Sequence, residues 1–325
     1  MKSIVSDLLN ITQKAAIAAY PWIGRGKKDE TDGASTNVMR NLLNQTDIEG
    51  VIVIGEGEMD KAPMLYINEK VGTGSGPIVD IAVDPVDGTT CVAQGQGDAI
   101  TVMAVAEKGG LLHAPDMYMK KIAVGPKASQ VIDIERPLTD NLKAVAKSLG
   151  KPVSDLNIMV QDRERHQSMI DEIRQIGSKA KLFSNVDITC AVSTAIIEKK
   201  IDMFVGIGGA PEGVIAATGL KCLGGNFQAQ LLPKNELEYQ RCVDMGITYP
   251  NQPLKLDDIV KTENCFFTAT GVTDGFLLKG VEEYRDYFIT HSFSATGRHG
   301  HYQFIKTVHS HIKHHKSNQP NVSMA

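Results

Sequence analysis

The sequence predicts an α/β fold, a layered α+β sandwich in which mixed sheets are flanked by helices in two subdomains. Apolar, β-branched runs at 51–54 and 78–83 have the composition of buried strands. From Leu138 onward, strand-like and helix-like stretches alternate. The chain has 325 residues, of which 42% are hydrophobic and 22% charged. That is enough for one large or two ordinary domains with a sizeable core.

The first half of the chain is expected to begin with a helix over 6–20, where apolar residues have helical spacing and Pro21 follows. Strands are then expected at 51–54, 78–84, 99–106 and 111–124. The last two are separated by Lys108-Gly109-Gly110, a turn signal. Part of this sheet should therefore be antiparallel.

The second half alternates in type, which is typical of layered α/β folds. We expect a soft boundary between subdomains near Gly150, with the active site in the cleft between 1–150 and 151–325. The expected elements are helix 138–150, strand 157–160, helix 166–176, strand 180–184, helix 188–199, strand 201–207 and a helix after Glu212.

Two carboxylates and a hydroxyl surround a predicted strand end in the stretch Asp84-Pro85-Val86-Asp87-Gly88-Thr89-Thr90. Open α/β sheets place ligands at the carboxyl ends of strands. Gly88 permits a left-handed backbone, and Thr89 can begin a helix whose free N–H groups favour an anion. The stretch predicts a divalent metal site beside a phosphate site, although Asp-Pro and Asp-Gly are also ordinary turn dipeptides.

Three further acidic positions support a metal site. Glu56 follows the strand at 51–54, Asp32 follows the basic turn at 25–28, and Glu212 follows the strand-like run at 201–205. Each alone would usually be a solvated loop charge, but crowded carboxylates repel unless a cation lies among them. Oxygen ligands without nearby Cys or His favour Mg²⁺ or Mn²⁺ over zinc, and paired ions recur in phosphoryl transfer.

Longer segments extend this pattern and resemble the class II fructose-1,6-bisphosphatases, the GlpX-type enzymes of bacterial gluconeogenesis. The similarity runs nearly without gaps from about 11 to 213 and resumes at 267–271. Its specific parts are Gly24-Arg25-Gly26-Lys27-Lys28, Val53-Ile54-Gly55-Glu56-Gly57-Glu58, Ala62-Pro63-Met64-Leu65-Tyr66, Val83-Asp84-Pro85, Ala114-Pro115-Asp116-Met117-Tyr118-Met119 and Ile207-Gly208-Gly209-Ala210-Pro211-Glu212-Gly213.

The resemblance implies a sugar-phosphatase-like fold. Residues 1–150 would form an N-terminal metal-binding phosphatase subdomain, and 151–325 a C-terminal α/β subdomain that completes the substrate pocket and ends in a His-rich polar tail. The implied activity is hydrolysis of the 1-phosphate of fructose 1,6-bisphosphate to fructose 6-phosphate and phosphate. Two or more Mg²⁺ or Mn²⁺ ions per site and a homo-oligomer, a tetramer or dimer, are expected with it.

The resemblance also implies roles for individual residues. Asp32 and Glu56 would bind one metal, and Asp84, Asp87 and Glu212 would surround a second. Asp60 matches a position that the family needs for catalysis. The remaining positions would bind the sugar phosphate or complete its pocket, and Asp87 belongs with them as well: Gly88, Thr89, Tyr118, Arg163, Glu164, Arg165, Asn185, Val186, Asp187 and Gly209.

Three of these positions depart from the usual family pattern. Asp87 stands where Glu is more frequent, so this ligand is one methylene shorter. Asn185-Val186 replaces the start of a common Asp-Gly-Asp turn, and Arg163-Glu164 stands where Lys-Pro is frequent. Arg163 keeps the positive charge, whereas Glu164 near a phosphate would be unfavourable unless it points away.

Thr89 has two possible roles in the implied reaction, and the sequence does not separate them. Its hydroxyl could orient the attacking water or attack phosphorus itself. Asp60 is the candidate that takes a proton from the nucleophile, and Lys28 the candidate that stabilises negative charge. For Lys28 the alternative is a solvated surface lysine, and for Tyr118 a half-buried aromatic residue of a strand.

Charge and composition exclude several other functions. A net charge of −4 provides no general attraction to nucleic acid or anionic membranes. No apolar run reaches spanning length and the first residues lack a signal-peptide core, so a cytoplasmic location is expected. Five scattered cysteines without paired spacing are expected to be reduced thiols, and the small residue Cys91 is expected to be buried.

Other functions remain open at this point. An inositol-phosphate or nucleotide phosphatase would share the motif from Asp84 to Thr89, and sedoheptulose bisphosphate is another possible substrate. A phosphosugar-binding sensor is the non-enzyme alternative. The final stretch, which is rich in histidine from His299 to His315, could bind a metal, but a solvated, partly disordered tail is the expectation.

Overall fold

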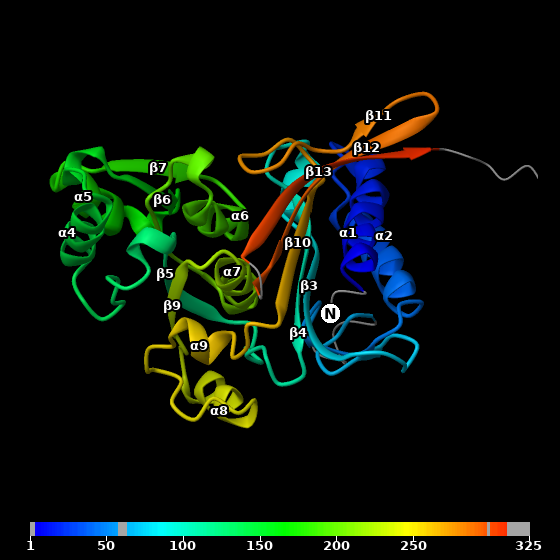
Figure 1. Ribbon diagram of the computed structural model, residues 1–325, viewed down its shortest axis with the longest axis horizontal. Coiled ribbons are helices and arrows are strands. Elements are labelled where there is room, and N and C mark those ends of the chain that lie inside the picture. The colour runs from blue at the N-terminus through cyan, green and yellow to red at the C-terminus, as the bar shows by residue number, and fades with distance from the viewer. Residues whose placement is uncertain (1–3, 58–63, 298–299, 311–325) are drawn as a thin grey trace, which may run out of the picture.

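The computed structural model describes residues 4–57, 64–297 and 300–310. Within them, the chain forms two mixed sheets with helices between and around them (Figure 1). The larger sheet has eight strands in the order β11-β12-β10-β4-β3-β1-β2, with β13 beside β12. Their bounds are β1 (Glu49–Ile54), β2 (Lys70–Val71), β3 (Ile78–Asp87), β4 (Ile100–Glu107), β10 (Cys265–Gly271), β11 (Glu282–Glu283), β12 (Tyr287–Thr296) and β13 (His301–Ser310).

The smaller sheet has five strands in the order β7-β6-β8-β5-β9. Strand β6 is parallel to both β7 and β8, whereas β5 is antiparallel to both β8 and β9. The fold class expected from the sequence, mixed sheets with flanking helices, is confirmed. The bounds are β5 (Tyr118–Val124), β6 (Asn157–Gln161), β7 (Lys179–Phe183), β8 (Met203–Gly209) and β9 (Asn226–Leu231).

Helices separate and cover the two sheets. Helices α1 and α2 pack on the outer face of the larger sheet, and α4 and α5 pack on the outer face of the smaller sheet. Helix α7 lies between the sheets and contacts strands of both. Apolar and small residues occur on all sides of α7, as expected for a helix with no solvent face. The helices are α1 (Val5–Ala19), α2 (Lys28–Leu43), α3 (Thr89–Gln94), α4 (Leu138–Leu149), α5 (Gln167–Gln175), α6 (Asp187–Val192), α7 (Ala210–Cys222), α8 (Glu236–Asp244) and α9 (Leu256–Ile259).

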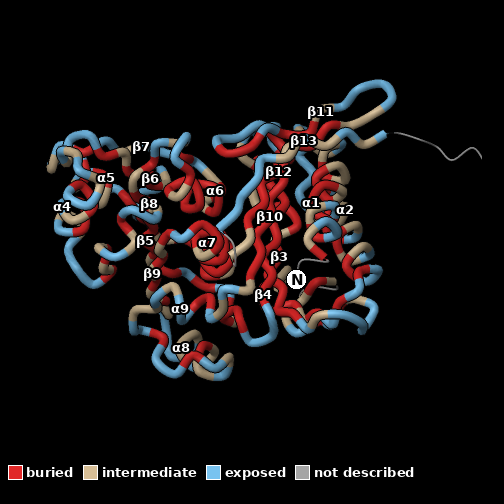
Figure 2. Tube along the Cα trace, in the orientation of Figure 1, coloured by how far each residue is buried: buried red, intermediate tan, exposed pale blue. Residues whose placement is uncertain are grey.

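Burial follows these layers. Figure 2 shows buried residues along β3, β4, β10 and α7 and mostly exposed residues in the outer loops. The largest apolar cluster fills the space between the sheets, a second lies under α1 and α2, and a third under α4 and α5. No described helix combines the length and apolar character needed to cross a bilayer.

Several sequence expectations were wrong. The helix expected at 188–199 ends as α6 at Val192, and two short 3₁₀ turns follow it up to Lys199. Strands β4 and β5 do not form a hairpin, because the free edge of β4 is taken by β10 and β5 belongs to the other sheet. Residues 111–117 are irregular apart from a bridge between Leu111 and Val260. The His-rich end is no tail over 301–310, because those residues pair along the whole of β12 as β13. His299, His311, His314 and His315 lie outside the described residues.

The strands also cross the expected subdomain boundary. The smaller sheet begins at β5, before Gly150, and the final strands return to the larger sheet. Gly150 does end α4, in a left-handed conformation. The division into 1–150 and 151–325 stays a prediction.

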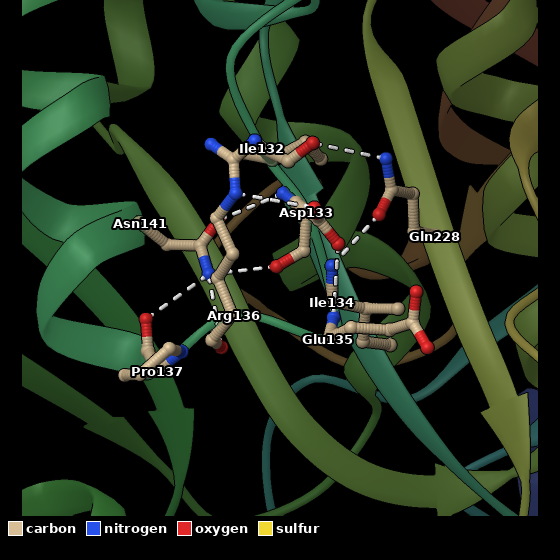
Figure 3. A network of polar contacts seen from close by, with 8 residues as sticks. All are labelled: Ile132, Asp133, Ile134, Glu135, Arg136, Pro137, Asn141 and Gln228. Atoms are coloured by element: carbon tan, nitrogen blue, oxygen red, sulfur yellow. Dashed lines mark hydrogen bonds and ion pairs between the residues drawn. The ribbon is translucent and has the colours of Figure 1, made fainter.

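The loop between β5 and α4 is held by two side chains (Figure 3). The Asn141 carboxamide accepts from Asp133 N–H and donates to Asp133 C=O, both at 2.8 Å. Gln228 of β9 accepts from Ile134 N–H and donates to Ile132 C=O. Residues 132–134 are thereby fixed against the smaller sheet without being a strand.

Candidate active site

A β-bulge brings Asp84 and Asp87 to one face of β3. Residues three apart in a regular strand point to opposite faces. Here Asp84 is opposite Val102 of β4 and Asp87 is opposite Ile100, so β3 carries one extra residue. Such a bulge turns the two carboxylates the same way. The Asp84 carboxylate also accepts a hydrogen bond from Val86 N–H at 3.0 Å within the bulge.

The turn after β3 has the predicted geometry. Gly88 has φ 94°, in the left-handed region, and α3 begins at Thr89. A Cβ at Gly88 would lie 2.9 Å from the Val186 side chain, so this turn packs tightly against the segment before α6. The Thr89 hydroxyl donates to Val86 C=O at 3.0 Å, which fixes the position of its oxygen.

Helix α2 brings Lys28 and Asp32 to the same place. The basic turn before it is bonded to α3, where Gly24 N–H donates to Val92 C=O and Gly26 N–H to Ala93 C=O, both at 2.8 Å. Asp32 therefore lies on a helix rather than in the loop that the sequence suggested. Glu56 follows β1, which is parallel to β3, so both strands deliver acidic residues to one sheet edge.

Glu212 enters from the other side, in the first turn of α7. A Cβ on Gly209, at the end of β8, would lie 1.9 Å from Glu212 Oε2, so a side chain at this position would displace the Glu212 carboxylate. Eight predicted residues from both halves of the chain line one cavity of about 570 Å³: Lys28, Asp32, Glu56, Asp84, Asp87, Gly88, Thr89 and Glu212.

Burial and mutual repulsion raise the pKa values of these carboxyl groups. Burial first, and then Asp84 and Asp32, raise the pKa of Glu56 to about 9. Burial, Glu212 and Asp32 raise that of Asp84 to about 8. Burial is also the main cause that raises the pKa values of Asp32, Asp87 and Glu212. Because five carboxyl groups share this space, their ionised forms are favourable only when cations are bound among them.

Two buried oxygens fit a cation. Asp87 Oδ2 and Glu212 Oε2 have no hydrogen-bond partner among the described residues. Such an orphaned, buried oxygen is costly unless a ligand satisfies it. No group of three or more Asp, Glu, His or Cys side chains in the described part of the chain forms a finished metal cage. The cavity therefore offers candidate ligands that face a common space rather than a closed coordination shell.

We name the turn at Gly88 and Thr89, where the sequence predicts a phosphate site, the phosphate turn. A second group of predicted residues lies on its solvent side, outside the lining of the cavity. Arg163 donates to the Asn185 carboxamide at 3.0 Å, and Arg165 donates to Ile207 C=O at 3.0 Å. The Arg165 guanidinium lies 5.1 Å from the centre of the Tyr118 ring. All three predicted side chains, Tyr118, Arg163 and Arg165, are exposed. They provide positive charge and a hydroxyl at the solvent side of the site.

Comparisons with known proteins bear on this arrangement. A family model described as bacterial fructose-1,6-bisphosphatase, glpX-encoded, matches residues 2–309. The chain belongs to this family. It is 41% identical over 321 residues to fructose-1,6-bisphosphatase 1 class 2 of Escherichia coli (strain K12), which covers 95% of each chain. It is 42% identical to the class 2 enzyme of Haemophilus influenzae, covering 95% of this chain and 96% of the other.

A solved structure with lower similarity is the extragenic suppressor protein suhB from Bartonella henselae. The two chains are 11% identical, with a TM-score of 0.35, and the match covers 59% of this chain and 73% of that one. The class 2 fructose-1,6-bisphosphatases match nearly end to end, so membership of the GlpX-type family agrees with the resemblance inferred from the sequence segments.

Several cavity residues were missed by sequence reasoning. Asp29 and Thr90 line it next to predicted residues, and Arg241 lines it from α8 without any local motif. Asp116 lies in a segment that marks the GlpX-type family, and that segment was the available signal. Asp60, the predicted proton acceptor, lies outside the described residues. Glu164 is exposed on a 3₁₀-helix, where its charge is solvated.

Proposed function

We propose that this chain hydrolyses the 1-phosphate of fructose 1,6-bisphosphate to fructose 6-phosphate and phosphate, as a gluconeogenic phosphatase. Its membership of the GlpX-type family supports this substrate class. The observation that carries the proposal is the shared cavity, in which five carboxylates and the Gly88–Thr89 turn face one space of about 570 Å³. That space is large enough for a phosphosugar end.

Two or more Mg²⁺ or Mn²⁺ ions are the proposed cofactors. Asp32 and Glu56 would bind one ion, and Asp84, Asp87 and Glu212 another. When bound, the ions would neutralise charge on the transferring phosphoryl group. The orphaned oxygens of Asp87 and Glu212 and the hard oxygen character of all five ligands support this choice.

The chain's own groups position the reacting phosphate. The Thr89 hydroxyl, held by Val86 C=O, keeps its lone pairs available to a water or to phosphorus. Lys28 lines the cavity and would stabilise negative charge on the phosphoryl oxygens. Asp60 is proposed to take the proton from the nucleophile. Both roles of Thr89 remain compatible with this geometry.

The exposed cluster beside the turn is proposed to bind the rest of the sugar phosphate. Arg163 and Arg165 supply charge for the second phosphate, and Tyr118 supplies a hydroxyl. Asn185, Val186, Asp187 and Gly209 would complete the pocket, since Val186 packs on Gly88 and Gly209 lies against Glu212. Glu164, which is solvated, is proposed to face away from the phosphate.

A homo-oligomer, a dimer or tetramer in the cytoplasm, is part of the proposal. Strand β13 is an edge strand that exposes Tyr302, Phe304 and Val308. These residues lie at even-numbered positions, so they share one face of the strand. An exposed apolar edge of this kind favours pairing with a second copy.

The deciding experiment measures phosphate release from fructose 1,6-bisphosphate by the purified protein with Mn²⁺, with Mg²⁺ and with a chelator. We expect metal-dependent release of one phosphate per sugar. Inositol monophosphate and sedoheptulose bisphosphate, tested in parallel, compare the alternative substrates. Binding of fructose 1,6-bisphosphate without release under any condition would instead indicate a phosphosugar sensor.

A further inference from the structure

One lysine is buried where the core would otherwise be apolar. Lys121 lies on β5, and its side chain is only 1% exposed. Its neighbours on the same face of the strand, Met119 and Ala123, belong to the apolar cluster between the two sheets. Burying an ammonium group is unfavourable unless negative groups surround it. The acidic side chains near Lys121 therefore explain how its ammonium group is stabilised in the core.

The direct partner of Lys121 is Asp187, the first residue of α6. Lys121 Nζ lies 2.7 Å from Asp187 Oδ2, and the Asp187 side chain is 15% exposed. A Cβ at Gly208 of β8 would lie 2.5 Å from that carboxylate oxygen and 3.2 Å from Lys121 Nζ. The absence of a side chain at this position makes room for the ion pair.

The pair lies beside two of the proposed metal ligands. A Cβ at Gly213, the residue after Glu212, would lie 3.4 Å from Lys121 Cε, and a Cβ at Gly88, the residue after Asp87, would lie 2.9 Å from the side chain of Val186, the residue before Asp187. Both ligands are buried, and each has one oxygen that no described residue satisfies. Asp187 also follows Val186, which packs against the phosphate turn at Gly88. The ion pair thus lies beside the acidic side of the cavity that β3 and α7 form.

We propose that Lys121 is a positioning residue of the active site. Its buried ammonium fixes the Asp187 carboxylate beside the phosphate turn and partly offsets the negative charge of Asp87 and Glu212, which weakens metal binding by this cluster and permits ion release. This inference rests on the proposed metal site. Lys121 itself is buried, so it acts through these carboxylates and not on the substrate.

The test compares variants by direct Mn²⁺ binding, measured by titration calorimetry on chelator-treated protein without substrate. Lys121→Met alone would leave the Asp187 carboxylate, which is 15% exposed, without its partner and could unfold the protein, whereas in Asp187→Asn the negative charges of Asp87 and Glu212 remain near the Lys121 ammonium. We therefore compare Asp187→Asn with the double variant Lys121→Met/Asp187→Asn, because replacing both members of a buried ion pair is often tolerated. Thermal unfolding confirms that each variant is folded.

We expect Asp187→Asn to bind Mn²⁺ more weakly than wild type and the double variant to bind about tenfold more tightly than Asp187→Asn, as for one nearby unit charge. Lys121→Arg/Asp187→Asn, which keeps the charge, should bind like Asp187→Asn. Lys120→Met is the matched control, because Lys120 Nζ donates to Ile134 C=O on the opposite face of the sheet. Its Mn²⁺ affinity should equal that of wild type.

Equal Mn²⁺ affinity in Asp187→Asn and the double variant would overturn the role of Lys121. The role would also be overturned if Lys121→Met/Asp187→Asn and Lys121→Arg/Asp187→Asn both bound Mn²⁺ more weakly than Asp187→Asn. Such a result would mean that the shape of the Lys121 side chain matters and its charge does not. Failure of the proposed function gives a different result. In that case the wild-type protein itself would bind no Mn²⁺ and release no phosphate.

Discussion

The pKa of each carboxyl group in this molecule depends on its surroundings. A solvated Asp or Glu titrates near pH 4. In the cavity, burial and neighbouring carboxyl groups raise the pKa of Glu56 to about 9 and that of Asp84 to about 8. A bound cation would reverse the balance, because it stabilises the ionised forms. Without metal, the site therefore holds protons that the unfolded chain would release.

Metal-free protein should lose stability as the pH rises. Raised pKa values in the folded state stabilise the fold fully below the ordinary values of 4.5 for Glu56 and 3.8 for Asp84. That stabilisation is lost as the pH rises through the folded values of about 8 and 9. We expect the melting temperature of chelator-treated protein, followed by circular dichroism, to fall as the pH rises from the ordinary values toward about 8 and 9. A melting temperature that rises with pH would contradict it.

Two comparisons sharpen this measurement. Glu56→Gln keeps the shape and removes the ionisation, so its melting temperature should depend less on pH. Added Mn²⁺ should raise the melting temperature most at high pH, where the carboxylates are free to bind it. If Mn²⁺ has the same effect at every pH, protons and metal do not compete for this site.

Replacement of Thr89 tests the hydroxyl. We expect Thr89→Ala to lower kcat by at least about a hundredfold, because it removes a group that either activates water or attacks phosphorus. Thr89→Ser keeps the hydroxyl and should retain part of the activity. The measurement is phosphate release at saturating fructose 1,6-bisphosphate and Mn²⁺. Equal activity in the two variants would remove Thr89 from the mechanism.

The sequence predicted five of the carboxylates that line the cavity because each stands in a short motif, but it missed Asp29 and Asp116. The segments around Glu56, Asp84 and Glu212 are strand ends followed by small residues, and local patterns show such ends. Arg241 and Lys121 could not be found this way. Arg241 reaches the cavity from a separate helix, and Lys121 looks like a surface residue until β5 is placed between other elements.

At the scale of elements, the Asn141 carboxamide is one of the two side chains that hold the loop between β5 and α4. Asn141 is 2% exposed and satisfies both Asp133 N–H and Asp133 C=O. Asn141→Ala would leave these two partly buried backbone groups without their partner, which costs about 1 kcal/mol. We expect a corresponding loss in the free energy of unfolding by urea, with kcat unchanged because the loop is outside the cavity lining.

The adjacent residue offers a control for this prediction. Asp140 lies next to Asn141 on α4 and is exposed. Asp140→Ala should change the free energy of unfolding by no more than about 0.5 kcal/mol. Equal destabilisation by both substitutions would mean that the helix surface, and not the loop network of Figure 3, carries the effect.

Elements with a clear periodic pattern were predicted, and elements defined by distant partners were not. Helix α1 and strands β1, β3 and β6 were found near their observed positions. Helix α2 was missed, because its sequence is polar and has a glycine in its second turn. Strand β4 pairs with β3 on one side and with β10, more than 150 residues later, on the other. No local sequence pattern predicts the pairing with β10.

At the scale of the whole molecule, the edge strand β13 predicts association. We expect light scattering after size-exclusion chromatography to show a multiple of the 35.2 kDa chain mass. Phe304→Lys with Val308→Lys places charges on the exposed face of β13 and should shift the protein toward the monomer. Lys306→Glu, a change of charge between these positions, is the comparison. An unchanged mass in Phe304→Lys/Val308→Lys would place the interface elsewhere.

The larger sheet is assembled from both ends of the chain. Strands β1 to β4 end at Glu107, whereas the strands that cover β4 begin only at Cys265. During synthesis, the intervening smaller sheet, whose strands lie between Tyr118 and Leu231, can form first from nearby segments. The unpaired edge of β4, next to the acidic strand β3, must wait for the last part of the chain. A ribosome-bound intermediate would thus expose this apolar strand, and its free edge would be a binding site for a chaperone that shields unpaired strands.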